Sequence, residues 1–123
     1  MPSCKVFEDE KVLSFLDIMP ANKGHCLVIP KNHSPTLTEM SDEDLTAVIK
    51  AAKKVARALS LSFGNASFNM VMSNGKEAGQ LVNHAHIHII PRFQKDRLRL
   101  KWSHQKYENN EINQYAEKIK KFI

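Results

Sequence analysis

The stretch His84-Ala85-His86-Ile87-His88-Ile89-Ile90 alternates histidines with apolar side chains, and a proline follows it. Alternation is typical of a half-buried β-strand, because successive side chains of a strand point to opposite faces. We therefore predict an extended segment over residues 81–90 whose three histidines share one face. The apolar residues between them then enter a core, so the backbone that builds the sheet also gathers three imidazoles.

Further strands and a helix are predicted on the N-terminal side of this stretch. Ser41, with acidic residues after it, is typical of a helix start, and apolar residues continue at helical spacing to Leu59. β-branched and aromatic residues favour strands at residues 5–7, 11–16, 26–29 and 68–72.

The last quarter of the chain carries two more patterns. Residues 95–102 alternate basic and apolar side chains, which predicts a half-buried extended segment. Apolar residues from Ile112 to Ile123 mark an amphipathic helix. This order of elements predicts an α+β domain, an antiparallel sheet of about five strands with one long helix and a C-terminal helix packed on it.

The length and composition limit the class of protein. The chain has 123 residues, enough for one domain over residues 1–123 and not for two. No apolar run approaches the roughly 20 residues of a membrane span, and the first residues lack a secretion signal. Cys4 and Cys26 alone make no disulfide framework. We therefore expect a cytoplasmic protein with reduced thiols.

The charge is unevenly distributed along the chain. The formal net charge is +5, and residues 1–91 hold nine basic and nine acidic residues, so the whole excess lies in residues 92–123. A basic excess can be no more than a solvated surface. It can also attract anionic ligands such as nucleotides.

Three aligned imidazoles allow three kinds of chemistry. They can bind zinc, copper or nickel and leave one coordination position open. One neutral imidazole can attack phosphorus or a carbonyl carbon while its neighbours orient it and move protons. They can also be hydrogen-bonded structural groups, which is the commoner role of a single histidine.

The residues ahead of the histidines favour a phosphate ligand. Gly75 and Gly79 allow close approach of the backbone, so that amide N–H groups can face an anion. The side-chain amides of Asn74 and Gln80 can donate to phosphate oxygens. Donors and a nucleophile in one place are what phosphoryl transfer requires.

These residues resemble the histidine-triad (HIT) family, whose signature is His-φ-His-φ-His-φ-φ with φ apolar. The resemblance covers residues 4–102. Further motifs stand in the family's order: Phe15-Leu16-Asp17-Ile18, Gly24-His25, Leu27-Val28-Ile29-Pro30-Lys31, Asn74-Gly75, Ala78-Gly79-Gln80 and Pro91-Arg92.

The resemblance implies a nucleotide hydrolase or nucleotidyl transferase that acts at the α-phosphate. His86 would be the nucleophile and would form a nucleotidyl-histidine intermediate that water cleaves. His84 and His88 would orient it and hydrogen-bond the phosphate region, with His25 close by. The family needs no metal or cofactor for this chemistry, and its smaller members are homodimers whose sheets join across the interface.

The resemblance also implies where the nucleotide binds. Asp17 would hold the ribose hydroxyls. The expected lining of the base pocket is Phe15, Ile18 and Leu27. The expected phosphate contacts are Ser73, Asn74, Gly79, Gln80 and Leu81.

Some positions depart from the family pattern. Ser73 stands where Asn is common, and Leu81 stands where a hydroxyl side chain is common, which affects the phosphate contacts. Many bacterial members begin with a Cys-x-x-Cys pair that binds zinc. Only Cys4 stands there in this chain, so we predict no structural zinc.

The third histidine distinguishes branches of the family. Uridylyltransferases and phosphorylases carry Gln at the position of His88, so a hydrolase is favoured here. The short chain favours the Hint-like branch, which cleaves nucleoside phosphoramidates such as AMP joined to an amine, over the Fhit-like branch, which cleaves diadenosine polyphosphates.

Two alternatives from other classes stay open. One is a metal-binding module built on the three histidines, and the other is a protein that senses nucleotides without turnover. We expect an AMP-like purine nucleotide as substrate, a homodimer, and neither nucleic acid nor membrane as a partner.

Overall fold

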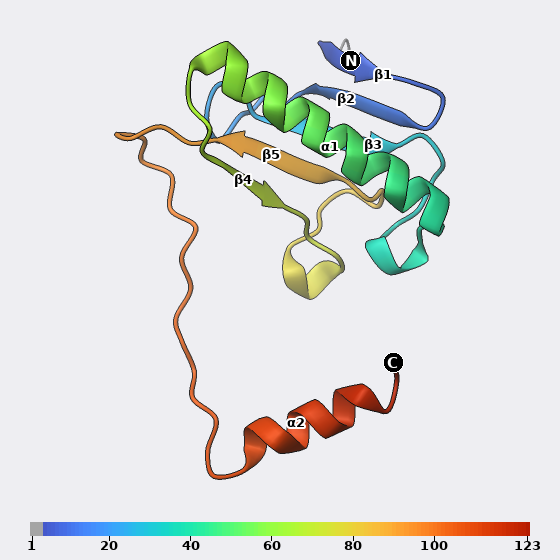
Figure 1. Ribbon diagram of the computed structural model, residues 1–123, viewed down its shortest axis with the longest axis vertical. Coiled ribbons are helices and arrows are strands. Elements are labelled where there is room, and N and C mark those ends of the chain that lie inside the picture. Colours follow the sequence, from blue (N-terminus) through green and yellow to red (C-terminus); the bar gives the residue numbers. More distant parts are fainter. Residues whose placement is uncertain (1–3) are drawn as a thin grey trace.

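A computed structural model describes residues 4–123 of the chain. Five strands form one antiparallel sheet in the order β1-β2-β3-β5-β4, which confirms the predicted fold class (Figure 1). The strands are β1 (Lys5–Glu8), β2 (Val12–Leu16), β3 (Cys26–Pro30), β4 (Phe68–Val71) and β5 (Ile87–Pro91). The helices are α1 (Asp42–Phe63), α2 (Glu111–Lys120) and the short 3₁₀ turns η1 (Leu37–Glu39) and η2 (Lys76–Ala78). No helix in this part of the chain is long and apolar enough to cross a bilayer.

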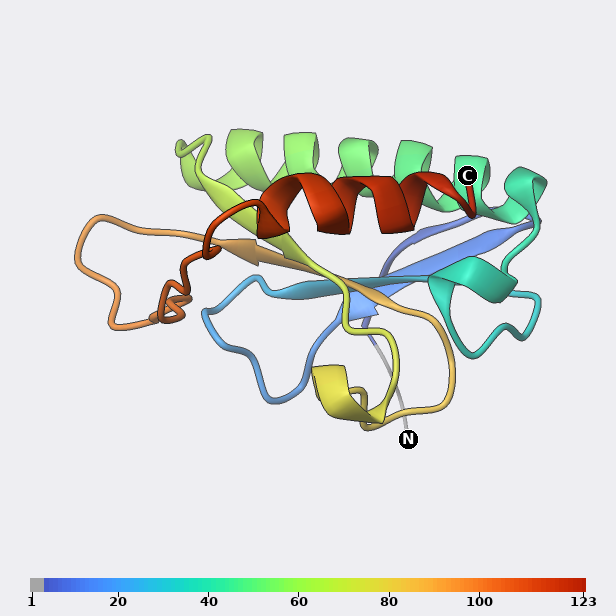
Figure 2. The same ribbon diagram turned by 90° about the horizontal axis from the view of Figure 1, so that it is seen from below.

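Helix α1 covers one face of the sheet and forms the core with it (Figure 2). The predicted start is confirmed, because the Ser41 hydroxyl accepts a hydrogen bond from the Asp44 N–H at 3.1 Å. The helix ends at Gly64, whose φ of +64° suits a C-terminal glycine. Its buried apolar stripe is Val48, Ala51, Ala52, Val55 and Ala56. Ile49, predicted to belong to the stripe, is 43% exposed on the flank next to β4.

The histidine stretch is extended, but the prediction of a strand from residue 81 was wrong. The ladder between β3 and β5 begins only where Val28 pairs with Ile87. Before that point the segment has no strand ladder and is held by other hydrogen bonds. One of them joins the His84 Nε2 atom to the Pro30 carbonyl at 2.8 Å. The alternation of burial still holds from His84 to Ile89, so the three histidines share one face as predicted.

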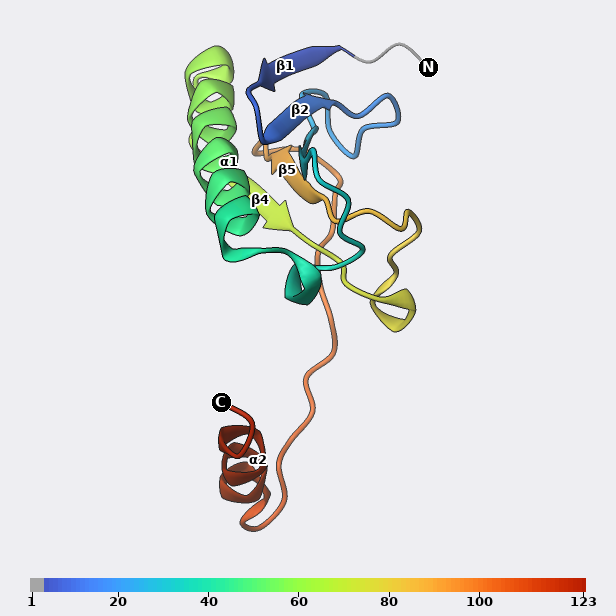
Figure 3. The same cartoon turned by 90° about the vertical axis from the view of Figure 1, so that its right-hand side faces the viewer.

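Residues 92–123, which we call the C-terminal arm, do not pack on the sheet as predicted. The arm leaves the end of β5, extends past the β4 edge and carries α2 away from the domain (Figures 1 and 3). Leu100 is 40% and Trp102 is 77% exposed, so the predicted half-buried segment is wrong. Within residues 4–123, Tyr107 contacts Tyr115 of α2 at a ring-centroid distance of 5.7 Å, but Ile112 and Ile119 on the same side of the helix stay 57% and 59% exposed.

The first residues of the arm are held firmly by one carboxylate. Asp96 accepts hydrogen bonds from the Arg92 guanidinium at 2.9 Å, from the Phe93 N–H at 2.8 Å and from the Asn22 side-chain amide at 2.9 Å. The Arg92 guanidinium beside Asp96 holds the pKa of that carboxyl well below its usual range. Because Asn22 belongs to the loop between β2 and β3, Asp96 links the root of the arm to that loop.

Candidate active site

Most of the predicted site residues line a cavity on the face of the sheet opposite α1. The cavity has a volume of about 440 Å³. Its lining combines strands β2, β3 and β5 with the loop after β4: Phe15, Asp17, Leu27, Ile29, Ser73, Gly79, Gln80, Leu81, Val82, His84, His86 and His88. Of the predicted residues, His25, Ile18 and Asn74 are not in this lining.

The position of the proton on His86 follows from its hydrogen bond. The Nδ1 atom of His86 lies 2.7 Å from the carbonyl oxygen of His84. A carbonyl can only accept, so Nδ1 carries the proton of the neutral ring and Nε2 keeps its lone pair. His86 therefore presents an unprotonated nitrogen, which is the form of imidazole that attacks an electrophile.

A second chain of hydrogen bonds fixes His25 and His88. The Ala21 N–H donates to His25 Nδ1 at 3.0 Å, so the neutral His25 ring carries its proton on Nε2. That nitrogen lies 2.9 Å from His88 Nδ1 and donates to it. His88 consequently carries its own proton on Nε2, where it can donate a hydrogen bond to a ligand. His25 is 5% exposed and acts from behind His88 rather than from the cavity wall.

Burial keeps both members of this pair neutral. Desolvation lowers the pKa of His25 below its ordinary value, and the nearby Asp17 carboxylate opposes the shift without cancelling it. Desolvation also lowers the pKa of His88, and the positive charge that His86 and His25 would carry lowers it further. Near neutral pH His25 and His88 therefore act as a neutral donor and acceptor pair.

His33 completes the environment of His84. The His84 Nε2 atom donates to the Pro30 carbonyl, so its Nδ1 atom is an acceptor, and His33 Nδ1 lies 3.1 Å from it. Both ring nitrogens of His84 are thus engaged, which orients its ring. The sequence gives no signal for this contact, because 51 residues separate the two histidines.

Asp17 lies at the end of the cavity beside the apolar side chains of Phe15 and Leu27. Its Oδ1 atom accepts a hydrogen bond from the Met19 N–H at 2.9 Å, which is the local role that a turn carboxylate commonly has. Its Oδ2 atom lies 3.8 Å from His25 Nε2 and has room to accept from a ligand. Ile18, predicted to line the base pocket, is 62% exposed outside the cavity.

In the loop that contains Gly75 and Gly79, the side-chain amides bind other parts of the protein instead of facing the cavity as donors. Gln80 accepts from the Gly75 N–H at 2.8 Å and donates to the carbonyls of Pro35 and Val82 at 2.6 and 2.9 Å. Its amide is already engaged in closing the loop, so the expectation that it donates to phosphate is not supported. Asn74 Oδ1 accepts from the Leu37 N–H at 2.7 Å and ties the loop to η1.

The donor atoms with metal-ligand spacing differ from the three histidines that the alternative of a metal-binding module would use. Within residues 4–123, Asp17, His25 and His88 each place one such atom within 4.8 Å of the others, and the three triad histidines form no such group. A metal on His25 needs a free ring lone pair. Nδ1 of His25 already accepts from Ala21, and Nε2 donates to His88. The cluster is therefore arranged as a hydrogen-bonded chain.

The lining also includes residues that the sequence did not mark. Ile29 and Val82 extend the apolar wall of the cavity. Ile29 follows from strand alternation, since it lies two residues beyond Leu27 on the same face. Val82 has no comparable signal, because it lies in an irregular segment whose direction only the folded loop determines.

The sheet, the long helix and the oriented imidazoles define a histidine-triad protein. The family model described as "HIT domain" matches residues 1–95, and the chain belongs to the HIT family. It is 44% identical over 98% of its length to the uncharacterised HIT-like protein MJ0866 of Methanocaldococcus jannaschii, of which it covers 91%. It is 36% identical over 97% of its length to the adenosine 5′-monophosphoramidase HNT1 of Saccharomyces cerevisiae, of which it covers 73%. The crystal structure of a HIT-family protein from Bacillus subtilis superposes with a TM-score of 0.92 at 40% identity, over 100% of this chain and 89% of that one.

Proposed function

We propose that this protein hydrolyses nucleoside phosphoramidates of the AMP-amine type at the α-phosphate, through a nucleotidyl intermediate on His86. The observation that carries the proposal is the His86 Nδ1 contact with the His84 carbonyl, which leaves the Nε2 lone pair for attack. The similarity to a protein named adenosine 5′-monophosphoramidase supports the choice of substrate class.

The first step transfers the nucleotidyl group to the protein. The Nε2 lone pair of His86 attacks the α-phosphorus, the new nitrogen–phosphorus bond forms, and the bond to the amine breaks with its electron pair. The departing amine takes a proton from the substrate or from a histidine of the site. The imidazole becomes cationic as the bond forms, and the His84 carbonyl, 2.7 Å from Nδ1, stabilises that charge.

The second step releases the nucleotide. Water attacks the same phosphorus, the bond to Nε2 breaks, and its electron pair returns to His86 as a lone pair. The attacking water loses one proton, to the solvent or back to the histidine that protonated the amine, and the nucleoside monophosphate leaves. His88 donates a hydrogen bond from Nε2 to a phosphate oxygen in both steps, and His25 keeps that proton in place by occupying Nδ1.

The rest of the cavity recognises the nucleotide. Asp17 Oδ2 accepts from the ribose hydroxyls, and Phe15 and Leu27 hold the base through apolar contact. Ser73 and the backbone near Gly79 face the phosphate. Leu81 is 96% exposed at the rim and supplies no side-chain donor, so phosphate binding depends on the histidines and on backbone N–H groups.

The test is turnover of an adenosine phosphoramidate and of a diadenosine polyphosphate, measured side by side with and without a chelator. We expect the phosphoramidate to react faster, indifference to the chelator, and loss of turnover by several orders of magnitude in His86→Ala. The matched control is His104→Ala, which removes an exposed imidazole in the arm. Faster cleavage of the dinucleotide would assign the Fhit-like activity. Nucleotide affinity without turnover in the wild type would favour a sensing module. Stoichiometric zinc in the purified protein, with activity lost to the chelator, would favour a metal-binding module.

We also propose that the chain forms a homodimer whose two sheets join through β4. This strand is a sheet edge, and Phe68 and Met70 on it are 42% and 50% exposed. Together with Ile49 of α1 they line a cavity of about 550 Å³ along that edge. Exposed edges with apolar side chains favour pairing with another chain. Sedimentation of wild type and of Met70→Asp tests this: we expect a dimer and a weakened dimer. The cytoplasmic location and the single domain over residues 1–123 remain predictions.

A further inference from the structure

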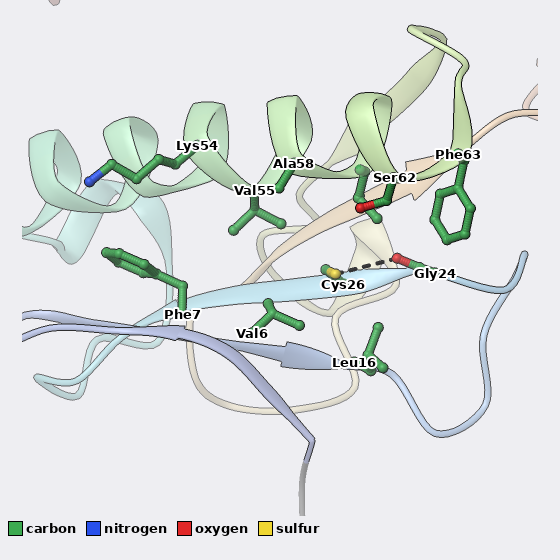
Figure 4. Close-up of a pocket in the computed structure, with 11 residues that line it drawn as sticks. Val6, Phe7, Leu16, Gly24, Cys26, Lys54, Val55, Ala58, Ser62 and Phe63 are labelled. Carbon is green, nitrogen blue, oxygen red and sulfur yellow. Dashed lines mark hydrogen bonds between the residues drawn. The ribbon is translucent and has the colours of Figure 1, made fainter.

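A third cavity lies on the helix-bearing face of the sheet, between α1 and strands β1 and β2. We call it the α1–β1 groove. It has a volume of about 510 Å³, and Figure 4 shows the apolar side chains that point into it. Its lining is Val6, Phe7, Leu16, Gly24, Cys26, Lys54, Val55, Ala58, Leu59, Ser62 and Phe63. Val6 and Phe63 at its rim are 49% and 47% exposed, so the groove is open and apolar.

The groove is separate from the active site. Strand alternation sends Leu16 and Cys26 to the groove, whereas their neighbours Phe15 and Leu27 line the histidine cavity on the other face. Burial raises the pKa of the Cys26 thiol to about 11, so the thiol is neutral and adds to the apolar floor. Nothing in the proposed hydrolysis uses this surface.

Helix α2 presents a complementary surface that its own domain leaves bare. Ile112, Tyr115 and Ile119 lie on one side of the helix at helical spacing and are 57%, 51% and 59% exposed, and Phe122 beyond them is 88% exposed. A helix of ten residues is marginal in water without tertiary contacts. The apolar side of α2 therefore needs a surface to pack on.

The direction of the arm indicates where that surface lies. The arm passes the β4 edge, and α2 lies on the side of the sheet that carries α1 (Figures 2 and 3). Two copies joined antiparallel at β4 are related by a two-fold axis perpendicular to the sheet, so both α1 helices lie on the same side. One copy's α2 then lies over the helix-bearing face of the second copy, where the α1–β1 groove opens.

The arm is long enough to reach the groove of a second copy. From β5 it must pass its own β4 and cross the partner's sheet toward β1, about six strand spacings or roughly 30 Å. The residues between Pro91 and Glu111 can span about 60 Å when extended. The match to the B. subtilis structure covers 100% of this chain, the arm included, at a TM-score of 0.92. Figures 1 and 3 show α2 apart from the sheet and from α1, so a similar placement in two proteins indicates a support for α2 outside its own domain.

We propose that α2 of one copy docks with its apolar side in the α1–β1 groove of a second copy, and that the two arms are exchanged reciprocally. The inference rests on the homodimer proposed above and adds an occupant for the groove. Each chain then covers two exposed apolar surfaces, one on its arm and one on its partner.

Amide hydrogen exchange of the peptide covering residues 111–123 tests the docking in the full chain. At protein concentrations above the dimer dissociation constant, we expect these amides to exchange at least about tenfold more slowly than in a free peptide. This protection should be lost on dilution to monomer. Sedimentation under the same conditions reports the dimer independently. A dimer whose α2 exchanges as fast as a free peptide overturns the docking and leaves the homodimer standing. A chain that never dimerises overturns the homodimer instead.

Two complementary variants distinguish exchange between chains from folding back within one chain. Ala58→Glu places a charge in the groove, and Ile119→Asp places one on the apolar side of α2. Each variant alone should lose α2 protection. In a mixture, the unaltered α2 of the Ala58→Glu chain should regain it by using the unaltered groove of the Ile119→Asp chain. The masses of the two peptides differ, so each α2 is followed separately.

The controls place the same charge nearby on the same helices. Leu61→Glu lies on the outer face of α1, and Gln114→Asp lies on the polar side of α2. Both should keep wild-type protection. No recovery in the mixture, or protection of α2 in Ala58→Glu alone, overturns the exchange. Binding of an added apolar dye to the groove of the wild-type dimer also counts against it, because the groove would then be open to small molecules.

Discussion

The Nε2 atom of His25 lies 2.9 Å from the Nδ1 atom of His88, and no part of His25 lines the cavity. His25 therefore acts by fixing which nitrogen of His88 carries the proton. His88 faces the ligand, and His25 orients His88 from behind. Because burial lowers the pKa of both rings, this pair makes the stability of the fold depend on pH.

Stability should fall as the pH falls below neutrality. The pKa of both His25 and His88 is lowered by burial, so between their folded values and about 6.5 the unfolded chain binds more protons than the folded chain. Their contribution to the free energy of unfolding is present above about pH 6.5 and is lost on acidification. Urea unfolding between pH 7.5 and 5 measures the slope. His25→Gln removes one of the two groups, so an unchanged slope in that variant contradicts the account.

A covalent intermediate should form on His86. Rapid quenching of the wild type with an adenosine phosphoramidate should yield a peptide over residues 84–90 that carries one nucleotidyl group, because attack by Nε2 precedes hydrolysis. Mass spectrometry of the quenched protein measures it. His86→Ala should show no adduct, whereas the His104→Ala control should show the wild-type amount. An adduct on another histidine would assign the nucleophile elsewhere.

Asp17→Asn should affect binding more than chemistry. The variant keeps an oxygen that can accept from the Met19 N–H, but it loses the charged acceptor for the ribose hydroxyls. We expect KM to rise about 10- to 100-fold, the effect of losing a hydrogen bond to a charged group, with a smaller change in kcat. Kinetics with ribose and 2′-deoxyribose substrates measure this. The two substrates should become more alike in the variant, whereas Asp42→Asn on α1 should leave both unchanged.

Gly24→Ala should destabilise the fold by about 2–3 kcal/mol, because its φ is +99° and a methyl group there lies 2.7 Å from the Phe63 ring. Gly64→Ala is the matched control. It has a φ of +64° and open space around it, so we expect about 1 kcal/mol from backbone strain alone. Urea unfolding of both variants measures the difference. Equal losses of unfolding free energy in the two variants would show that the contact with Phe63 does not add to the destabilisation.

The sequence predicted those parts of the molecule whose pattern is local. The α1 stripe, the Ser41 cap and the alternation around His86 follow from spacing, since each depends on neighbours within a turn or a strand. The start of β5 was misplaced because it depends on where the ladder with Val28 begins, and residue spacing carries no such information.

Long-range pairing and quaternary contacts were harder to predict. The contact of His33 with His84 depends on how the loop after Pro30 closes. The pattern of α2 indicates that one side of the helix is buried, but not against which chain. The helix was therefore predicted correctly and its packing was not. Gln80 suggested a phosphate donor by its residue type, and only the folded loop shows its amide to be engaged.

Strand β3 contributes Cys26 to the α1–β1 groove and Leu27 to the histidine cavity. Alternate residues of one strand therefore line the two surfaces. A single inserted or deleted residue between Gly24 and Pro30 would exchange the two linings and disrupt both at once. The segment of the arm between Asp96 and α2 has no such constraint. Changes in chain length during the divergence of this protein should therefore accumulate in that segment and be absent from β3.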